Sequence, residues 1–189
     1  MTIDSILKSG GIGVLATDTI YGVVGTALNR KTVERVYRVR RRNPKKPLII
    51  LIGSVDDLKL FHIPLTAARK KILRRLWPGK VSVILPCARK KFAYLHRGTK
   101  TLAFRLPAKK DLRALLAATG PLVAPSANWE GHPPALTIAK ARKYFGGKVD
   151  FYANAGTTRS LPSTLVALRN GRLAVLRQGA VKIDKSGIF

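Results

Sequence analysis

Short apolar runs separated by turn-forming residues dominate the hydrophobic pattern of the chain. Seven of these runs are rich in aliphatic and β-branched residues, and Gly, Pro or Asn bounds most of them. Runs of this length and composition are typical of strands. The predicted strands are Gly13–Thr17, Leu48–Ile52, Val81–Leu85, Thr101–Leu106, Leu122–Ala124, Thr164–Leu168 and Leu173–Leu176.

Four other segments repeat their apolar residues at helical spacing. In Leu65–Leu76 the apolar residues fall on one face and the arginines on the other, which is the pattern of an amphipathic helix. Pro78-Gly79 and Gly146-Gly147 mark where two of these segments have stopped. The predicted helices are Lys31–Arg38, Leu65–Leu76, Asp111–Ala118 and Thr137–Phe145.

Asn170-Gly171 lies between the last two apolar runs and predicts a two-residue hairpin turn. Thr164 and Arg177 are equally far from the centre of that turn, so Ser163 and Arg177 can meet at one end of the sheet. The alternative is that Arg177 only covers apolar surface with its stem. A hairpin together with crossover helices favours a mixed sheet over an all-parallel one.

Length and composition limit the class of protein. The 189 residues suit one domain, residues 1–189, and 46% hydrophobic residues exclude a solvated basic tail. No apolar run approaches the roughly 20 residues that span a bilayer, so we expect a soluble, cytoplasmic protein. The single cysteine, Cys87, excludes an intramolecular disulfide, and three scattered histidines form no zinc pattern. We predict no protein-bound metal.

The charge of the chain is strongly positive. Lys and Arg number 36 against nine Asp and Glu, which gives a formal net charge of +27. Such a surface attracts polyanions, of which nucleic acid is the usual one. The alternative is a proteome that is basic throughout, and the even spread of the cations along the chain leaves both interpretations open.

Three polar segments are candidates for a binding site. Thr17–Gly22 places two hydroxyls, a carboxylate and a phenol directly after a strand, although Thr, Asp and Gly are also ordinary turn residues. Arg40–Pro47 holds five cations in eight residues, stiffened by two prolines, and suits either an anion site or a solvated loop. Pro125–Asn128 offers a hydroxyl and an amide, which suit an uncharged ligand group or a simple turn.

Several common chemistries are excluded. The chain has no P-loop, and Gly11–Ala16 matches a dinucleotide fingerprint only in the wrong context, before a strand instead of after one. Nine scattered acids are poor material for paired-carboxylate hydrolysis, and no G-x-S-x-G elbow occurs. Abundant Arg and Lys beside Ser, Thr and Asn suit phosphate chemistry, in which catalysis is mostly positioning and electrostatics.

Taken in order, the segments resemble the YrdC-like family of threonylcarbamoyl-AMP synthases over about residues 5–181, in its short, single-domain form. The motifs that carry the resemblance are Gly13–Gly22, Val36–Leu48, Trp77-Pro78-Gly79, Phe104–Pro107, Pro125–Asn128, Ser163–Val166 and Val175–Gly179. The resemblance implies a three-layer α/β fold of the α+β class, with helices on both faces of a twisted, mixed sheet of about seven strands.

The resemblance also implies a reaction. The family joins L-threonine, bicarbonate or CO2, and ATP, and releases threonylcarbamoyl-AMP and pyrophosphate. Mg²⁺ arrives with the ATP, and a partner enzyme then moves the threonylcarbamoyl group to tRNA. The tRNA and that enzyme are therefore further partners to consider, and no membrane is involved.

Site residues follow from the family motifs. Threonine-binding residues would be Thr19, Tyr21, Arg105, Ser126 and Ser163. ATP-binding residues would be Arg42, Lys46, Thr101, Asn128 and Arg177. Catalysis would rest on Arg40, Arg42 and Lys46, whose charges would stabilise the reacting phosphate.

Three positions depart from the family pattern. Arg40 stands where the family usually has Lys, Leu51 where many members have His, and Ala167 where Asp is frequent. The departures at Arg40 and Ala167, together with the charge of +27, support an alternative. In that alternative the chain is an RNA-binding relative without synthase activity.

Overall fold

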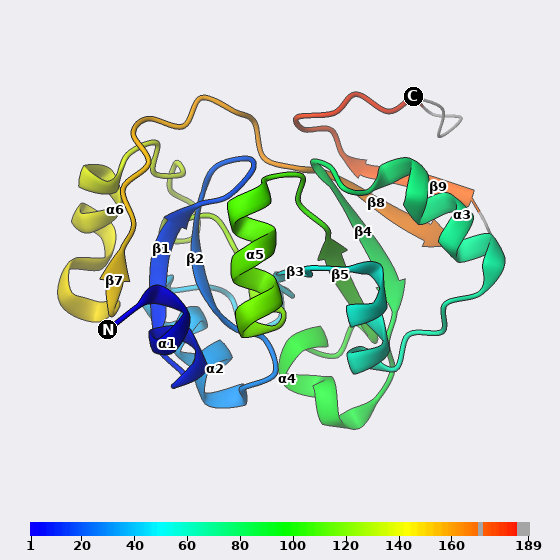
Figure 1. Ribbon diagram of the computed structural model, residues 1–189, viewed down its shortest axis with the longest axis horizontal. Coiled ribbons are helices and arrows are strands. Elements are labelled where there is room, and N and C mark those ends of the chain that lie inside the picture. Colours follow the sequence, from blue (N-terminus) through cyan, green and yellow to red (C-terminus); the bar gives the residue numbers. More distant parts are fainter. Residues whose placement is uncertain (170–171, 185–189) are drawn as a thin grey trace.

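One mixed sheet of nine strands runs through the computed structural model, which describes residues 1–169 and 172–184 (Figure 1). The strand order is β7-β1-β2-β6-β3-β5-β4-β8-β9. The strands are β1 (Ile12–Ala16), β2 (Tyr21–Thr26), β3 (Ile49–Leu51), β4 (Val81–Pro86), β5 (Thr101–Arg105), β6 (Leu122–Val123), β7 (Phe151–Tyr152), β8 (Thr164–Arg169) and β9 (Arg172–Arg177).

Helices cover both faces of this sheet, as expected. The helices are α1 (Ile3–Lys8), α2 (Arg30–Val39), α3 (Ala67–Leu76), α4 (Ala93–His96), α5 (Lys110–Thr119) and α6 (Ile138–Phe145), with 3-10 turns η1 (Val55–Phe61), η2 (Lys90–Phe92) and η3 (Gly146–Lys148). Figure 1 shows α1 and α5 in front of the sheet and α2 behind it. Leucines of α1 and α5 pack on one face in a small core, and a larger core holds α2 and α6 against the other.

The seven predicted strands are all present, but the count of about seven is too low because β2 and β7 were missed. Two glycines, Gly22 and Gly25, lower the strand propensity of β2. Close packing explains the glycine at position 25, where a Cβ would lie 2.5 Å from Cγ2 of Thr32 in α2. The other missed strand, β7, has only two residues.

The four predicted helices are confirmed, and side-chain caps begin three of them. Thr66 and Thr137 accept hydrogen bonds from the third residue of α3 and α6, and Asn29 does so for α2. Each cap satisfies one of the backbone N–H groups that a helix start leaves free. In the described part of the chain, none of the helices combines the length and apolar character needed to cross a bilayer.

Strands β8 and β9 pair antiparallel, as the hairpin prediction requires, while the turn residues Asn170-Gly171 lie outside the described residues. The pairs nearest the turn follow the predicted register. A register shift between Leu165 and Val166 then moves the pairing by one residue. Arg177 therefore pairs with Leu165 and not with Thr164, the residue equally far from the turn along the chain.

The chain after β9 folds back tightly on the start of β8. Oγ1 of Thr164 accepts hydrogen bonds from the backbone N–H groups of Gly179, at 3.0 Å, and Val181, at 3.2 Å. A Cβ on Gly179 would lie only 2.2 Å from the carbonyl oxygen of Pro162. Glycine is therefore required here, and the contact fixes the end of β9 beside Ser163.

We predict that Gly179→Ala lowers the free energy of unfolding by about 1–3 kcal/mol, because the added methyl group overpacks the turn. Urea unfolding measures the change. Gly147→Ala is the control, since nothing lies within 4 Å of a Cβ at Gly147. The control should stay within about 0.5 kcal/mol of the parent. Equal losses in the two variants would contradict the close-packing argument.

Candidate functional site

A pocket gathers residues from the ends of β1, β5, β6 and β9 and from the residue that precedes β8. It encloses about 440 Å³ of space, with its open mouth included. The structure brings six of the predicted site residues into its wall, which include the five predicted to bind threonine. They are Thr19, Tyr21, Arg105, Ser126, Ser163 and Arg177.

The tight turn between β1 and β2 directs hydroxyl groups into this pocket. Oγ1 of Thr17 donates to the carbonyl of Ile20 at 2.8 Å and lies 3.0 Å from Oγ1 of Thr19. The backbone N–H of Thr19 also donates to Oγ1 of Thr17, at 3.2 Å. Thr17 thus closes the turn, and Thr19 lines the pocket on a backbone that the turn holds in place.

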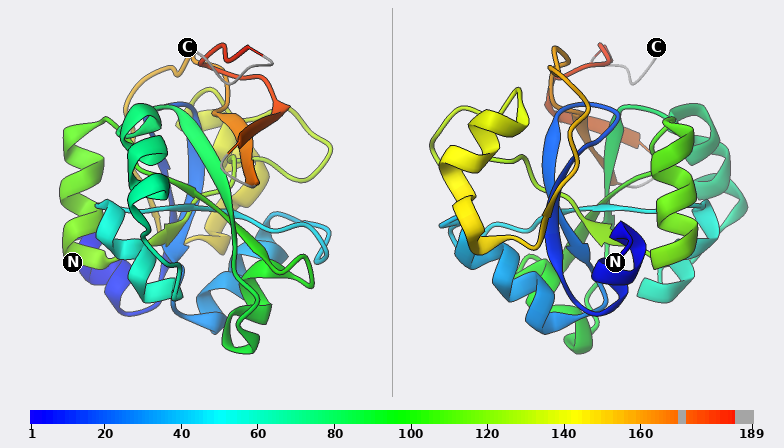
Figure 2. Two further views of the ribbon diagram at one scale, coloured as in Figure 1. Left: turned by 90° about the vertical axis from the view of Figure 1, so that its right-hand side faces the viewer. Right: turned by 60° about the vertical axis from the view of Figure 1, so that its left-hand side comes forward.

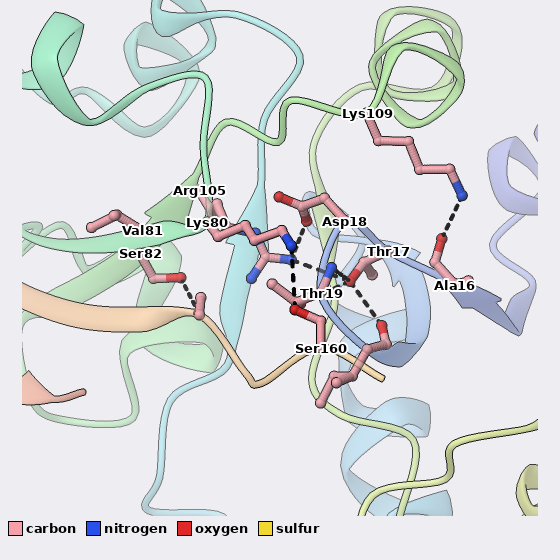
Figure 3. Close-up of polar contacts among 12 residues, drawn as sticks. Ala16, Thr17, Asp18, Thr19, Lys80, Val81, Ser82, Arg105, Lys109 and Ser160 are labelled. Atoms are coloured by element: carbon pink, nitrogen blue, oxygen red, sulfur yellow. Dashed lines mark hydrogen bonds and ion pairs between the residues drawn. The ribbon is translucent and has the colours of Figure 1, made fainter. Parts of the chain in front are cut away.

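Arg105 is the buried cation of the pocket, with 3% of its surface exposed. Its Nη2 lies 2.9 Å from Oδ1 of Asp18 and donates to Oγ1 of Thr17 at 3.4 Å (Figure 3). Burial lowers the pKa of Arg105, whereas the charge of Asp18 raises it. The pair is incompletely satisfied, because Nε of Arg105 and Oδ2 of Asp18 have no hydrogen-bond partner among the described residues.

The end of β9 supplies a second guanidinium. Nη2 of Arg177 donates to the carbonyl of Ser163 at 2.8 Å, which confirms that these two residues meet. Oγ of Ser163 lies 2.8 Å from Oγ of Ser82, and both serines are buried. The positive charge of Arg177 contributes to the lowered pKa of Arg105. A pocket with two guanidiniums that repel each other favours an anionic ligand.

Tyr21 ties a covering segment to the pocket. The segment between β7 and β8 arches over one end of the sheet (Figure 1). The Tyr21 hydroxyl donates to the carbonyl of Gly156 at 2.8 Å and accepts from the N–H of Ala155 at 2.9 Å. Further along, Nζ of Lys80 donates to Oγ of Ser160 at 3.3 Å. The hydroxyl of Tyr21 is therefore occupied by the protein, and its ring forms part of the wall.

Arg40 is buried beneath the segment that follows β6, with 2% of its surface exposed. Its Nε donates to the carbonyl of Ser126 at 2.7 Å, and its Nη2 lies 3.3 Å from both Oγ of Ser126 and Oδ1 of Asn128. Burial, with a smaller contribution from Arg42, lowers the pKa of Arg40 to about 10. This geometry gives Arg40 the role of positioning Ser126.

Arg42 and Lys46 do not line the pocket. They belong to the basic segment, Arg40–Pro47. Arg42 donates from Nη2 to the carbonyl of Pro47 at 3.0 Å. Nζ of Lys46 lies 2.7 Å from Oε1 of Glu130, whose other oxygen accepts from the N–H of Asn43. These two contacts, that of Asn43 first, lower the pKa of Glu130. The basic segment is thus folded around one carboxylate.

Two predicted ATP ligands are placed differently from expectation. Nδ2 of Asn128 donates to the carbonyls of Trp129, at 2.6 Å, and His132, at 2.8 Å, so its amide is committed to its own loop. Thr101 begins β5 and Arg105 ends it, which separates the two by about 13 Å at the usual rise per residue. The structure does not bring Thr101 into the pocket.

Sequence analysis did not identify the two carboxylates that hold the basic residues of the site. Asp18 pairs with Arg105 and Glu130 with Lys46. A usable signal was present, since only nine acidic residues occur in the chain, and Asp18 stands within a candidate binding segment while Glu130 follows another by two residues. In the part of the chain that the structure describes, His, Cys, Asp and Glu form no cluster that could hold a metal ion.

One family model matches most of the chain. The model of the Sua5–YciO–YrdC family, described as telomere recombination, matches residues 5–179. The chain belongs to the Sua5–YciO–YrdC family.

Two relatives are named threonylcarbamoyl-AMP synthases. The threonylcarbamoyl-AMP synthase of Thiobacillus denitrificans is 32% identical over 168 residues, which cover 88% of this chain and 89% of that protein. The synthase of Pyrococcus abyssi is 28% identical over 181 residues, and this chain spans only 53% of its length.

Solved structures of the Sua5–YciO–YrdC family have the same fold. Pyrococcus abyssi Sua5 complexed with L-threonine superposes with a TM-score of 0.85 at 28% identity, over 93% of this chain and 52% of that one. Escherichia coli YciO superposes with a TM-score of 0.84 over 97% of this chain and 90% of that one, at 21% identity, which shows the fold alone.

We predict that Asp18→Asn lowers the free energy of unfolding by about 3–5 kcal/mol, because it leaves the Arg105 guanidinium buried without a counter-charge. Thermal or urea unfolding measures the loss. The control is Asp56→Asn, which breaks the exposed Asp56–Lys59 pair and should cost at most about 1 kcal/mol. Losses of the same size in both variants would show that burial of the Asp18 pair is unimportant.

Proposed function

We propose that this chain is an L-threonylcarbamoyladenylate synthase, which makes threonylcarbamoyl-AMP from L-threonine, bicarbonate or CO2, and ATP. The observation that carries the proposal is the pair Arg105 and Arg177, set in one hydroxyl-lined pocket. Relatives that are threonylcarbamoyl-AMP synthases support the same reaction. They give no support to the alternative of an RNA-binding protein without synthase activity.

The pocket offers complementary groups for threonine. The guanidinium of Arg105 would bind the α-carboxylate through charge-assisted hydrogen bonds. The hydroxyls of Thr19, Ser126 and Ser163 would serve the polar groups of the amino acid. Tyr21 would enclose the ligand, because its hydroxyl holds the covering segment over the pocket. Threonine bound in the Pyrococcus abyssi relative supports this assignment.

Three cations other than Arg105 would bind ATP. Arg177, Arg42 and Lys46 would neutralise the triphosphate, and Asn128 with Arg40 would hold the neighbouring loop in shape. Lys46 has to leave Glu130 in order to reach a phosphate, which is an inexpensive step because the Lys46 side chain is 60% exposed. Magnesium would arrive with the nucleotide as part of the substrate and would neutralise part of the phosphate charge, since the described residues provide no carboxylate cluster for it.

The chemistry then consists of two bond-forming steps. Bicarbonate, where it is the carbon source, takes up a proton and loses water to give CO2. The neutral amino group of threonine adds to CO2, gives up one proton to water and becomes a carbamate. An oxygen of that carbamate attacks the α-phosphorus of ATP, and pyrophosphate leaves. The cations of the site stabilise the charge that develops on the phosphate oxygens, which is where such enzymes gain most of their rate.

We further propose a cellular location and a partner for the enzyme. Residues 1–189 would form one YrdC-type domain that acts in the cytoplasm. Its product would pass to a partner enzyme, which transfers the threonylcarbamoyl group to tRNA.

The decisive experiment measures pyrophosphate release from the purified chain with ATP, bicarbonate and threonine. We expect release only when threonine is present. Serine and valine are matched controls, because serine lacks the methyl group of threonine and valine lacks its hydroxyl. Release that is independent of threonine, or no release from folded protein, would refute the proposed activity.

We predict that Arg105→Lys raises the KM for threonine by roughly 10- to 150-fold and leaves the KM for ATP unchanged. The fold-change corresponds to losing about 1.5–3 kcal/mol of charged hydrogen bonding. Lysine keeps the charge that faces Asp18, so the variant should fold. Arg42→Ala is the companion variant and should raise the KM for ATP alone. An equal rise of both KM values in either variant would contradict the separation of the two subsites.

A further inference from the structure

A second cavity, the α5 cavity, lies between α1, β1, the start of α5 and the start of the covering segment. It encloses about 650 Å³ of space, with its open side included, which is within the size range of small-molecule sites. Figure 2 (right) shows α1 beside α5, with the chain that leaves β7 running along β1. Among the described residues, the α5 cavity and the proposed synthase pocket have no lining residue in common. The wall is formed mainly by Ile3, Leu15, Lys109, Asp111, Leu112 and Leu115, with residues 153–155 of the covering segment.

Most of this wall is apolar. Leu15 and Leu112 are buried, and Ile3 and Leu115 are partly buried against the same small core. Ala153 adds a methyl group from the covering segment. An aliphatic side chain placed here would remove apolar surface from water on both the ligand and the protein, which favours binding.

The polar groups of the α5 cavity include one charge of each sign. Lys109 reaches from the start of α5 toward Ala16 and donates from Nζ to its carbonyl at 3.4 Å, a long hydrogen bond (Figure 3). Asp111 stands two residues further on, and no ion pair joins Lys109 or Asp111 to another described residue. Oδ1 of Asn154 accepts from the N–H of Gly156 at 3.1 Å, so the side-chain N–H groups of Asn154 are the ones left for a ligand.

We propose that the α5 cavity binds a free amino acid with an apolar side chain, such as leucine, as an effector of the synthase. The carboxylate of the ligand would accept hydrogen bonds from Lys109 and Asn154, and its ammonium group would donate to Asp111. Its side chain would lie against the leucines of the wall. The effect of this ligand on catalysis rests on the proposed function, whereas its binding does not.

Other small molecules match the α5 cavity less completely. A simple carboxylate, such as a short fatty acid, would pair with Lys109 but would place a second negative charge near Asp111. An amine without a carboxylate would place a second positive charge near Lys109. Threonine has a smaller apolar part than leucine and would bring its hydroxyl group against an apolar wall. An apolar amino acid satisfies both charges and the wall.

Two stretches of backbone join the α5 cavity to the proposed synthase pocket. Ala16, whose carbonyl binds Lys109, is followed by Thr17, which closes the β1–β2 turn. The N–H of Ala155 donates to the hydroxyl of Tyr21, in the pocket wall, at 2.9 Å. Residues 153–163 have no regular secondary structure, so a ligand packed against residues 153–155 would stabilise the covering segment in this position. We therefore expect leucine and threonine to strengthen each other's binding by the same factor.

The first test measures the affinity of the full chain for leucine by NMR titration, without ATP or threonine. Lys109→Gln and Asp111→Asn should each weaken binding by roughly tenfold or more, because each removes one charged partner of the ligand. Lys110→Gln is the matched control and should leave the affinity unchanged, since Lys110 is an exposed cation next in the chain that does not line the α5 cavity. Equal losses in Lys109→Gln and Lys110→Gln would overturn the proposal.

Two analogues of leucine test the class of ligand. Isocaproate lacks the amino group and isoamylamine lacks the carboxylate, so each should bind roughly tenfold more weakly than leucine, or weaker still. An analogue that binds as tightly as leucine would overturn the assignment to an amino acid. Displacement of leucine by threonine would also overturn it, because leucine would then occupy the threonine pocket.

Pyrophosphate release separates this inference from the proposed function. Leucine should lower the KM for threonine by about fivefold or more in the parent and not in Lys109→Gln, whose release without leucine should match the parent. A KM that leucine raises or leaves unchanged would overturn the effector role. A parent chain that binds leucine in the α5 cavity but releases no pyrophosphate would refute the synthase and leave the amino-acid site standing.

Discussion

Burial of two guanidiniums beside one pocket is the constraint around which this end of the sheet is organised. Arg40 and Arg105 cannot shed their charge as a lysine can, so each must be compensated where it lies. Arg105 is compensated by the carboxylate of Asp18, and Arg40 by the oxygens of Ser126 and Asn128. These contacts join the β1–β2 turn to β5, and α2 to the loop after β6. The pocket therefore exists only when distant parts of the chain have come together.

Arg105 is paired with a charged group and Arg40 with uncharged oxygens, and the two arginines differ in what they do at the pocket. Asp18 neutralises Arg105 from the β1–β2 turn, and the guanidinium still contributes to the pocket wall. Arg40 points its donors at backbone and side-chain oxygens of the Ser126 loop and lies outside that wall. The fork of Arg40 reaches two residues of the loop at once. Arg40 therefore holds this loop in place and contributes no group to the pocket wall.

Local patterns predicted most of the fold, and the family motifs predicted six residues of the pocket. Apolar runs located seven strands, and helical spacing located α2, α3, α5 and α6, because each signal lies within a few neighbouring residues. The strand β2 was not predicted because one of its glycines, Gly25, serves tight packing against Thr32, a contact between separate elements. The partners Asp18, Ser82 and Glu130 were not predicted either, because their contacts also join separate elements. A carboxylate beside a strand becomes meaningful only when the topology shows which arginine it faces.

The scarcity of acidic residues connects the site to the charge of the whole molecule. With nine acids for 36 cations, most positive side chains lack a carboxylate partner and are left to water and counterions. Yet Asp18 pairs with Arg105 at the pocket, Glu130 pairs with Lys46 in the basic segment, and Asp150 pairs with Arg35 of α2. In these places the acid fixes the geometry of a cation without cancelling the local excess of positive charge. The net charge thus attracts anions to the whole surface. A few carboxylates determine where the attracting cations are held in fixed positions.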